Sequence, residues 1–173
     1  MFSSPEKSID KCGIQVGMDI ADFGAGSGLY TFASARSLMS TGRVYAVDVQ
    51  KELLSKLKND ATRRGLYNVE VIWGDLDKPS GSKLREHSVD LVLLCNILFQ
   101  SENQKAVMME AKRVLKPAGR VLVVDWESKA KGVGPKETTS KKTVLGMFEK
   151  AGFHLDREVE AGEHHYGLLF KKL

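Results

Sequence analysis

The sequence predicts a three-layer α/β fold in which a mostly parallel sheet is covered by helices on both faces. Short apolar runs alternate with longer stretches of helical periodicity as far as about residue 151. Such alternation is typical of parallel strands joined by crossover helices. The tail, residues 154–170, indicates two strands around a turn near Gly162. This terminal hairpin breaks the alternation, so we expect it to add one antiparallel strand to the sheet.

Length and composition indicate one globular domain. The chain has 173 residues, of which 42% are hydrophobic and 28% charged. These values are close to the globular norm and exclude a disordered chain or a coiled coil. No internal repeat or linker divides the chain, so residues 1–173 are expected to form a single domain.

Charge and cysteine content limit which cellular compartments and which binding partners are expected. The net charge of +4 is mildly basic and diffuse, so nucleic acid is not an expected partner. The two cysteines, Cys12 and Cys95, are too few for a disulfide scaffold and favour a reducing compartment. The N-terminus lacks the apolar segment of a secretory signal, and no apolar run is long enough to span a membrane. We therefore expect a cytoplasmic protein without a membrane span.

The first half of the chain predicts three strands, at residues 18–23, 44–47 and 69–73. The helix after the second strand ends near Gly65. The helix after the first strand is expected to carry four apolar residues at helical spacing: Leu29, Phe32, Ala33 and Met39.

The second half predicts two further strands before the terminal hairpin. Residues 89–94 are nearly all apolar, which is typical of a strand buried on both faces, and residues 121–124 form the next strand. Residues 101–104 have the pattern of a capping box that opens the intervening helix, and residues 117–119 are expected to stop it. Residues 128–140 are a surface loop or a lid. Ser140 is expected to cap a last helix that Gly152 ends.

A glycine cluster lies between the first strand and its helix, with the sequence DFGAGSG at residues 22–28. In an open α/β sheet the ligand crevice lies at the carboxyl ends of the strands, where glycines let the backbone approach a ligand. A tight turn alone explains one glycine well but three poorly. The dinucleotide pattern requires a third glycine where Leu29 stands.

The carboxylate of Asp22 favours a different ligand. It would repel a pyrophosphate and attract an ammonium group, while the helix N-terminus favours a carboxylate. A ligand with an amino acid at one end and a nucleoside at the other satisfies both. S-adenosylmethionine is such a molecule.

Five segments together resemble the class I S-adenosylmethionine-dependent methyltransferases, whose fold is Rossmann-like. They are DFGAGSG, VYAVDV, VIWGDL, SVDLVLLCNILFQ and RVLKPAGRVLVVDW, and the resemblance covers roughly residues 12–173. Within that family, NILFQ and RVLKPAGR are most similar to the small C-methyltransferases of quinone biosynthesis.

The resemblance implies a set of cofactor-binding residues. Asp48 would bind the ribose hydroxyls, Asp75 the adenine amino group, and Val49 would contact the adenine face. Alternatives remain: Asp48 as a helix cap, Asp75 as a turn residue and Val49 as core. The expected cofactor-binding residues are Asp22, Gly24, Ala25, Gly26, Gly28, Asp48, Val49, Gly74, Asp75, Leu76 and Asn96.

Other residues are candidates for the acceptor side, although no catalytic residue can be identified from the sequence. One of three histidines could reach the substrate: His165 first, with His154 and His164 as alternatives. Trp126 either packs in the core or stacks on the substrate. Cys95 is expected to be a buried small residue rather than a nucleophile. No metal site is expected.

The predicted function is transfer of a methyl group from S-adenosylmethionine to a small-molecule acceptor. Residues 96–99, which read NILF, lack the motif of enzymes that methylate exocyclic base amines. The alternatives are an NAD(P)-dependent oxidoreductase and a catalytically silent S-adenosylmethionine-binding module. The chain is expected to be a monomer or a homodimer.

Overall fold

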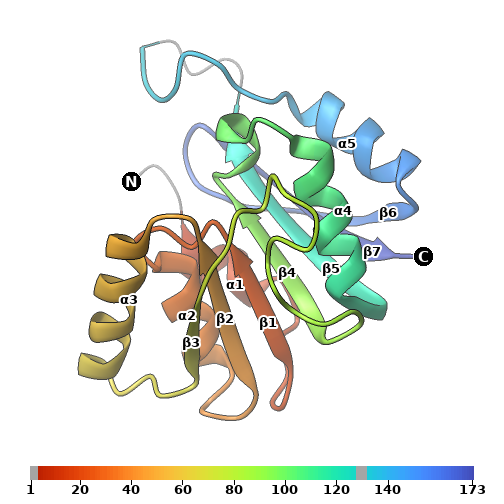
Figure 1. Cartoon of the computed structure of the whole chain (residues 1–173). Helices are drawn as coiled ribbons and strands as arrows, with labels where there is room; N and C mark the ends of the chain where they lie inside the picture. Colours follow the sequence, from red (N-terminus) through yellow and green to blue (C-terminus); the bar gives the residue numbers. More distant parts are fainter. Residues whose placement is uncertain (1–3, 128–131) are drawn as a thin grey trace.

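A computed structural model describes residues 4–127 and 132–173, in which a seven-stranded sheet is flanked by helices (Figure 1). The strand order is β3-β2-β1-β4-β5-β7-β6. The strands are β1 (Asp19–Phe23), β2 (Arg43–Asp48), β3 (Val69–Trp73), β4 (Val89–Cys95), β5 (Leu115–Trp126), β6 (Phe153–Val159) and β7 (His165–Lys172). The helices are α1 (Pro5–Asp10), α2 (Leu29–Ser37), α3 (Lys51–Arg63), α4 (Gln104–Val114) and α5 (Lys141–Lys150), with a 3₁₀ turn at Leu98–Gln100.

The expected mostly parallel sheet is confirmed. Strands β1 to β5 pair in parallel, and β7 runs antiparallel to both of its neighbours, β5 and β6. From β1 the chain first builds outward to β2 and β3, and then returns to place β4 on the other side of β1. The direction of winding therefore reverses between β1 and β4, and such a switch point opens a crevice at the carboxyl ends of the strands.

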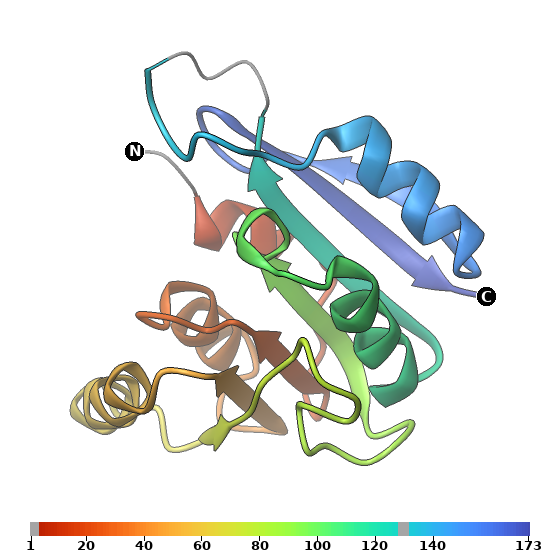
Figure 2. The ribbon, with the colours of Figure 1, turned by 45° about the horizontal axis from the view of Figure 1, so that its top comes forward.

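Two apolar clusters cover the two faces of the sheet, and Figure 2 shows the helices arranged in these two layers. One cluster joins α1, α2 and α3 to the sheet through Ile9, Phe32 and Leu57. The other joins α4 and α5 through Val107 and Phe148. Strand β4 contributes to both clusters, as expected of a strand buried on both faces.

The start of α4 differs from the expected capping box. Asn103 is the N-cap, and its side chain accepts a hydrogen bond from the Ala106 N–H at 3.0 Å. Ser101 lies outside the helix and donates instead to Asp77. The prediction was wrong because two residues only two positions apart, Ser101 and Asn103, both suit a cap, and the tertiary contact with Asp77 decides between them.

Two further expectations were wrong in detail. Helix α4 ends at Val114, and β5 begins at Leu115, so Pro117 lies in the strand and does not stop the helix. Met39 lies beyond the end of α2 and is 75% exposed, because the helix stops two residues before it. Helix α1 was not expected; its sequence signal is the proline at its first turn.

Residues 74–88, between β3 and β4, contain no helix, and buried side chains fix this segment. Glu110 of α4 accepts hydrogen bonds from the N–H and the hydroxyl of Ser82. The same carboxylate forms a salt bridge with Arg113 at 2.7 Å. Arg113 also donates to the Leu84 carbonyl at 2.7 Å. These contacts hold the segment against α4.

The C-terminal part follows the prediction closely. The Ser140 side chain accepts a hydrogen bond from the Thr143 N–H and caps α5, and Gly152 follows the helix with a φ of +87°. Of the proposed lid at residues 128–140, residues 128–131 lie outside the described residues. Thr139 is held to the fold, because its carbonyl accepts a hydrogen bond from the Tyr166 hydroxyl at 2.8 Å. Within residues 4–127 and 132–173, no helix has the length and apolarity to cross a membrane.

Candidate cofactor-binding site

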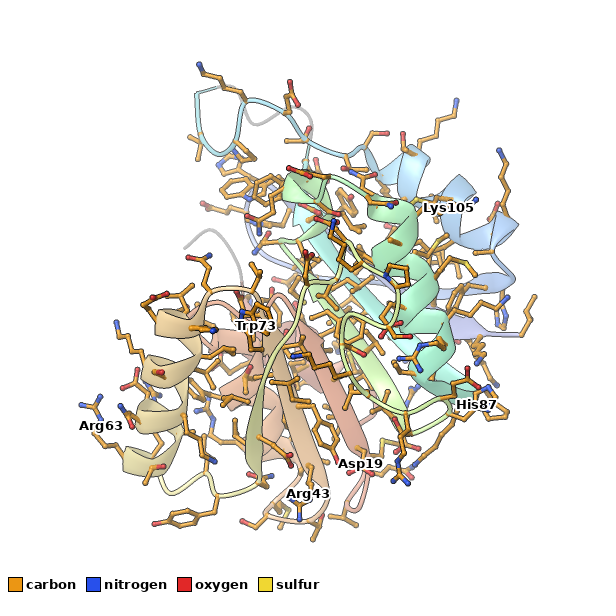
Figure 3. All side chains as sticks on the ribbon, viewed as in Figure 1. Asp19, Arg43, Arg63, Trp73, His87 and Lys105 are labelled. Carbon is orange, nitrogen blue, oxygen red and sulfur yellow. The ribbon has the colours of Figure 1, made fainter. Side chains whose placement is uncertain are left out.

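The predicted site residues gather at the carboxyl ends of the strands. Figure 3 marks the two edges of the sheet: Asp19 and Arg43 lie where strands begin, and Trp73 lies where β3 ends. At the carboxyl edge are two hollows, of about 180 Å³ and about 160 Å³, which share Gly24 as a wall. We call them the first hollow and the second hollow.

Of the eleven residues predicted to bind a cofactor, ten line these hollows. The first hollow is lined by Gly24, Asp48, Val49, Gly74, Asp75 and Leu76. The second is lined by Asp22, Gly24, Ala25, Gly26 and Asn96. Gly28 lines neither hollow.

The glycines of the loop have different roles. Gly28 is the N-cap of α2 with a φ of +87°, and a Cβ there would lie 2.9 Å from Leu57 and Phe32, so helix packing requires this glycine. A Cβ at Gly26 would meet only the Gly24 carbonyl, at 4.0 Å. The loop therefore leaves open space at Gly26, where a ligand can approach the backbone.

Asp22 is more enclosed than its predicted contact with an ammonium group suggests. It is 2% exposed, and its Oδ2 accepts a hydrogen bond from the Thr31 hydroxyl at 2.6 Å. The pKa of Asp22 is raised to about 6, chiefly by burial and to a smaller extent by the nearby Asp48 carboxylate, while the Thr31 bond opposes the shift. The residue still forms part of the wall of the second hollow. A cation placed there would stabilise the ionised carboxylate.

Asp48 joins two segments of the site. Its Oδ2 accepts a hydrogen bond from the Gly26 N–H and its Oδ1 accepts one from the Gln50 N–H, both at 2.9 Å. The N-cap of α3 is Gln50, not Asp48. A carboxylate has about four lone-pair positions, so two remain for the hydroxyls of a ligand. The position of Asp48 in the first hollow suits a diol.

Asp75 lies at the far side of the first hollow, after the end of β3. Its Oδ1 accepts the Asp77 N–H at 3.1 Å. Gly74 is required for packing, because a Cβ there would lie 2.1 Å from the Gly81 carbonyl oxygen. Val49 is 54% exposed and Leu76 is buried. Val49 is therefore not a core residue, and its side chain offers an apolar surface at the hollow.

Asn96 follows β4 in a left-handed conformation with a φ of +57°. Its Oδ1 is buried and has no hydrogen-bond partner among the residues that the structure describes. Since an unpaired buried polar atom costs about 1–3 kcal/mol, this atom is suited to a donor on a bound molecule. The adjacent Cys95 is buried, which raises the pKa of its thiol well above the usual range. Cys95 is therefore a poor nucleophile.

The ends of β5 and β7 place further polar groups at the same edge. His165 pairs with Trp126 across the two strands, and their ring centroids lie 4.3 Å apart. The His165 Nδ1 lies 2.8 Å from the Glu163 carbonyl oxygen, while Nε2 is buried and has no partner within residues 4–127 and 132–173. Beside them, burial raises the pKa of Asp125 to about 6 although it accepts two backbone hydrogen bonds.

The other two histidines differ in position. His154 lies near the start of β6, which runs parallel to β5 because both are antiparallel to β7. It is therefore at the opposite edge of the sheet from the hollows. His164 is exposed in the turn before β7. Of the three histidines, the structure brings only His165 into a buried position at the carboxyl edge.

Sequence reasoning missed several residues of the hollows. Asp77, Gln100 and Ser101 line the first hollow, and Tyr30 lines the second. Asp77 could have been identified from the sequence, because it is a further acidic residue two positions after Asp75. The remaining three reach the site only through the packing of α2 and of the turn before α4.

The strand order, the glycine loop after β1 and the acidic residues at the carboxyl ends of β2 and β3 define the class I, Rossmann-like fold of S-adenosylmethionine-dependent methyltransferases. The family model described as "Methyltransferase domain" matches residues 14–163. The chain therefore belongs to this methyltransferase family.

Individual relatives agree with this assignment. The crystal structure of an S-adenosylmethionine-dependent methyltransferase from Aquifex aeolicus is 30% identical, with a TM-score of 0.87, covering 99% of this chain and 91% of that chain. A demethylmenaquinone methyltransferase of Tropheryma whipplei is 30% identical over 124 residues, which are 71% of this chain and 48% of the relative. An arsenite methyltransferase of Halobacterium salinarum is 28% identical over 109 residues, 63% of this chain and 27% of the relative. The chain thus spans less than half the length of these two curated relatives.

Proposed function

We propose that this chain is a single methyltransferase domain, residues 1–173, that transfers a methyl group from S-adenosylmethionine to a small organic acceptor. The observation that supports it most is the division of carboxylates between the two hollows. Asp22 lines the second hollow, while Asp48 and Asp75 line the first. This arrangement suits a ligand with an ammonium group at one end and a nucleoside at the other.

The residues present fit this ligand chemically. Asp48 has lone pairs for ribose hydroxyls, Asp75 can accept from the adenine amino group, and Val49 presents an apolar surface to the base. When bound, S-adenosylmethionine supplies a methyl group already activated by a positive sulfur. The chain's contribution is then to hold that group against a nucleophile, and such positioning can lower a barrier by about 7–11 kcal/mol.

The acceptor side is proposed to lie beside Asn96, Trp126 and His165. With its Nδ1–H donated to the Glu163 carbonyl, His165 would keep a lone pair on Nε2. That lone pair could accept a proton from an acceptor hydroxyl or amine. The curated relatives include methyltransferases named for demethylmenaquinone and for arsenite. Both cysteines of this chain are buried, and burial raises the pKa of each thiol, which favours an organic acceptor over arsenite.

Two alternatives differ from this proposal in chemistry. An NAD(P)-dependent oxidoreductase would need to place a pyrophosphate near the Asp22 carboxylate. A catalytically silent module would bind S-adenosylmethionine in the same two hollows and transfer no methyl group.

We further propose that the protein acts in the cytoplasm, as a monomer or a homodimer, and without nucleic acid. The mild net charge of +4 and the two free cysteines support these proposals.

The experiment is incubation of the protein with methyl-labelled S-adenosylmethionine and a fractionated cell extract. The expected result is label in a small organic molecule, and less label at the same subsaturating cofactor concentration when Asp48→Ala replaces the wild-type protein. Binding of S-adenosylhomocysteine with no labelled product would favour the silent module. Label in RNA or DNA would contradict a small-molecule acceptor.

A further inference from the structure

No helix follows β3, and the segment after this strand is held in place by side-chain hydrogen bonds. Its backbone forms consecutive turns, in which the Lys78 N–H donates to the Asp75 carbonyl and the Gly81 N–H to the Lys78 carbonyl, both at 3.1 Å. Turns of this kind fix local shape only. The orientation of Asp75 relative to the rest of the first hollow must come from contacts with another element.

Asp77 provides such a contact. Its Oδ1 accepts hydrogen bonds from the Ser101 hydroxyl at 2.5 Å and from the Asn103 N–H at 3.1 Å. Through its own N–H, Asp77 donates to Asp75 Oδ1 at 3.1 Å. A continuous chain of hydrogen bonds therefore runs from Asp75 through Asp77 to the start of α4.

This series of hydrogen bonds connects two walls of the same hollow. Asp75 and Asp77 line the first hollow from the β3 side, and Ser101 lines it from the β4 side. Ser101 follows the 3₁₀ turn, and Asn103 is the N-cap of α4, so both donors are fixed by helical ends. Hydrogen bonds to a charged acceptor are stronger than neutral ones. The two bonds to the Asp77 carboxylate oxygen therefore hold Asp77 strongly to the segment that contains Ser101 and Asn103.

We infer that Asp77 is a positioning residue for the nucleoside end of the ligand: it sets Asp75 at the correct distance across the first hollow by bridging to Ser101 and Asn103. This inference rests on the proposed function, because it assigns the first hollow to the nucleoside. Asp77 acts through Asp75 and not by contact with the reacting atoms.

The inference makes the effect of Asp77 depend on Asp75. The test is a double-mutant cycle with S-adenosylhomocysteine as the probe and isothermal titration calorimetry as the measurement. Asp77→Ala removes both bonds and is expected to weaken binding by about tenfold. Asp77→Asn keeps one acceptor oxygen and is expected to bind within about threefold of wild type. In an Asp75→Ala background, adding Asp77→Ala should produce no further loss.

Two further variants keep the result interpretable. Ser101→Ala removes only one bond and should give a smaller loss than Asp77→Ala, so it serves if Asp77→Ala fails to fold. Asp10→Ala, an exposed carboxylate on α1, is the matched control and should bind as wild type does.

The outcomes separate a positioning role from a purely structural one. Equal losses from Asp77→Ala in the presence and absence of the Asp75 carboxylate, or unchanged affinity in a folded Asp77→Ala protein, would overturn the inference. A wild-type protein that does not bind S-adenosylhomocysteine would overturn the proposed function, and this inference with it.

Discussion

The Asp48 carboxylate accepts a hydrogen bond from the Gly26 N–H at 2.9 Å and thereby joins the end of β2 to the glycine loop that follows β1. One carboxylate thus connects the two hollows that share Gly24 as a wall. Because Asp48 orders the loop and is also assigned to the ribose, its removal should affect both halves of the site.

Replacing Asp48 should weaken ligand binding. Asp48→Ala removes charged hydrogen bonds to the ribose, and we expect a loss of about 1–3 kcal/mol in the binding free energy of S-adenosylhomocysteine. Isothermal titration calorimetry measures this loss, with Asp10→Ala as the control. An affinity equal to that of wild type would refute the ribose role.

The affinity for S-adenosylhomocysteine should depend on pH through Asp22. With a pKa of about 6 for Asp22 in the free protein, its carboxyl group is mostly protonated and neutral at pH 5 and mostly ionised at pH 7. The ligand's amino group remains protonated below about pH 7.7. Affinity should therefore rise between pH 5 and pH 7, by no more than about tenfold per pH unit.

The matched variant is Asp22→Asn, which can still accept a hydrogen bond from Thr31. It should bind more weakly than wild type at pH 7 and show a flat profile over the same range. Parallel pH profiles for the two proteins would exclude Asp22 as the titrating group.

Asp125 should lower stability at neutral pH. Its folded pKa of about 6 lies above the usual 3.8, so the folded state binds the proton more tightly, and the free energy of unfolding falls as pH rises from about 4 to 6. This difference between the folded and unfolded pKa of Asp125 corresponds to about 3 kcal/mol in the free energy of unfolding. The free energy of unfolding of Asp125→Asn, relative to that of wild type, should therefore increase as the pH rises from 4.5 to 7.5.

Urea denaturation at the two pH values measures this change. Because an amide oxygen replaces only one of the two acceptors for Phe99 and Trp126, the variant is expected to be the less stable protein at pH 4.5. A stability difference that does not change with pH would show that Asp125 has an ordinary pKa.

Glu110 should be essential for the segment between β3 and β4. Glu110→Ala leaves Arg113 and Ser82 without their partner in a largely buried position, and we expect a loss of about 3–5 kcal/mol in the free energy of unfolding. The hydrogen bonds from Arg113 and Ser82 outweigh burial and lower the pKa of Glu110, so its contribution is present above the unfolded pKa and is lost as pH falls through the folded one. Glu102→Ala, at an exposed position, is the control in the same denaturation experiment.

Gly81 should be required for the shape of the first hollow. A Cβ there would lie 1.8 Å from the Asp75 carbonyl oxygen, so Gly81→Ala must displace the backbone next to Asp75. We expect weaker binding of S-adenosylhomocysteine together with a lower melting temperature. Gly146→Ala in α5, where a Cβ meets nothing within 4 Å, should leave binding unchanged and raise stability slightly. Wild-type affinity in Gly81→Ala would show that the backbone there can shift freely.

Most of the fold follows from the sequence because strands and helices differ in period. Strand β4 is recognisable from its apolar run, and α5 from Ser140 before it and Gly152 after it. The start of α4 was not predictable, because Ser101 has an Asp77 partner that only tertiary structure provides. Pro117 is tolerated at the beginning of β5, where the pairing with β4 is irregular.

The site could be predicted where the sequence motif itself lies at the end of a strand. Asp48 and Asp75 meet this condition, and both line the first hollow. Gly28 belongs to the glycine loop at residues 22–28, but its place is decided by the packing of Leu57 and Phe32. Ser101 and Tyr30 come from segments whose approach to the hollows depends on long-range packing, which periodicity does not encode.

The central claim is that the glycine loop and its carboxylates bind an amino acid joined to a nucleoside, and not a dinucleotide. The most direct measurement is equilibrium titration of the wild-type protein with S-adenosylhomocysteine and, separately, with NADH. We predict saturable binding of S-adenosylhomocysteine with one site per chain and no saturable binding of NADH. Tight binding of NADH without a response to S-adenosylhomocysteine would contradict the account.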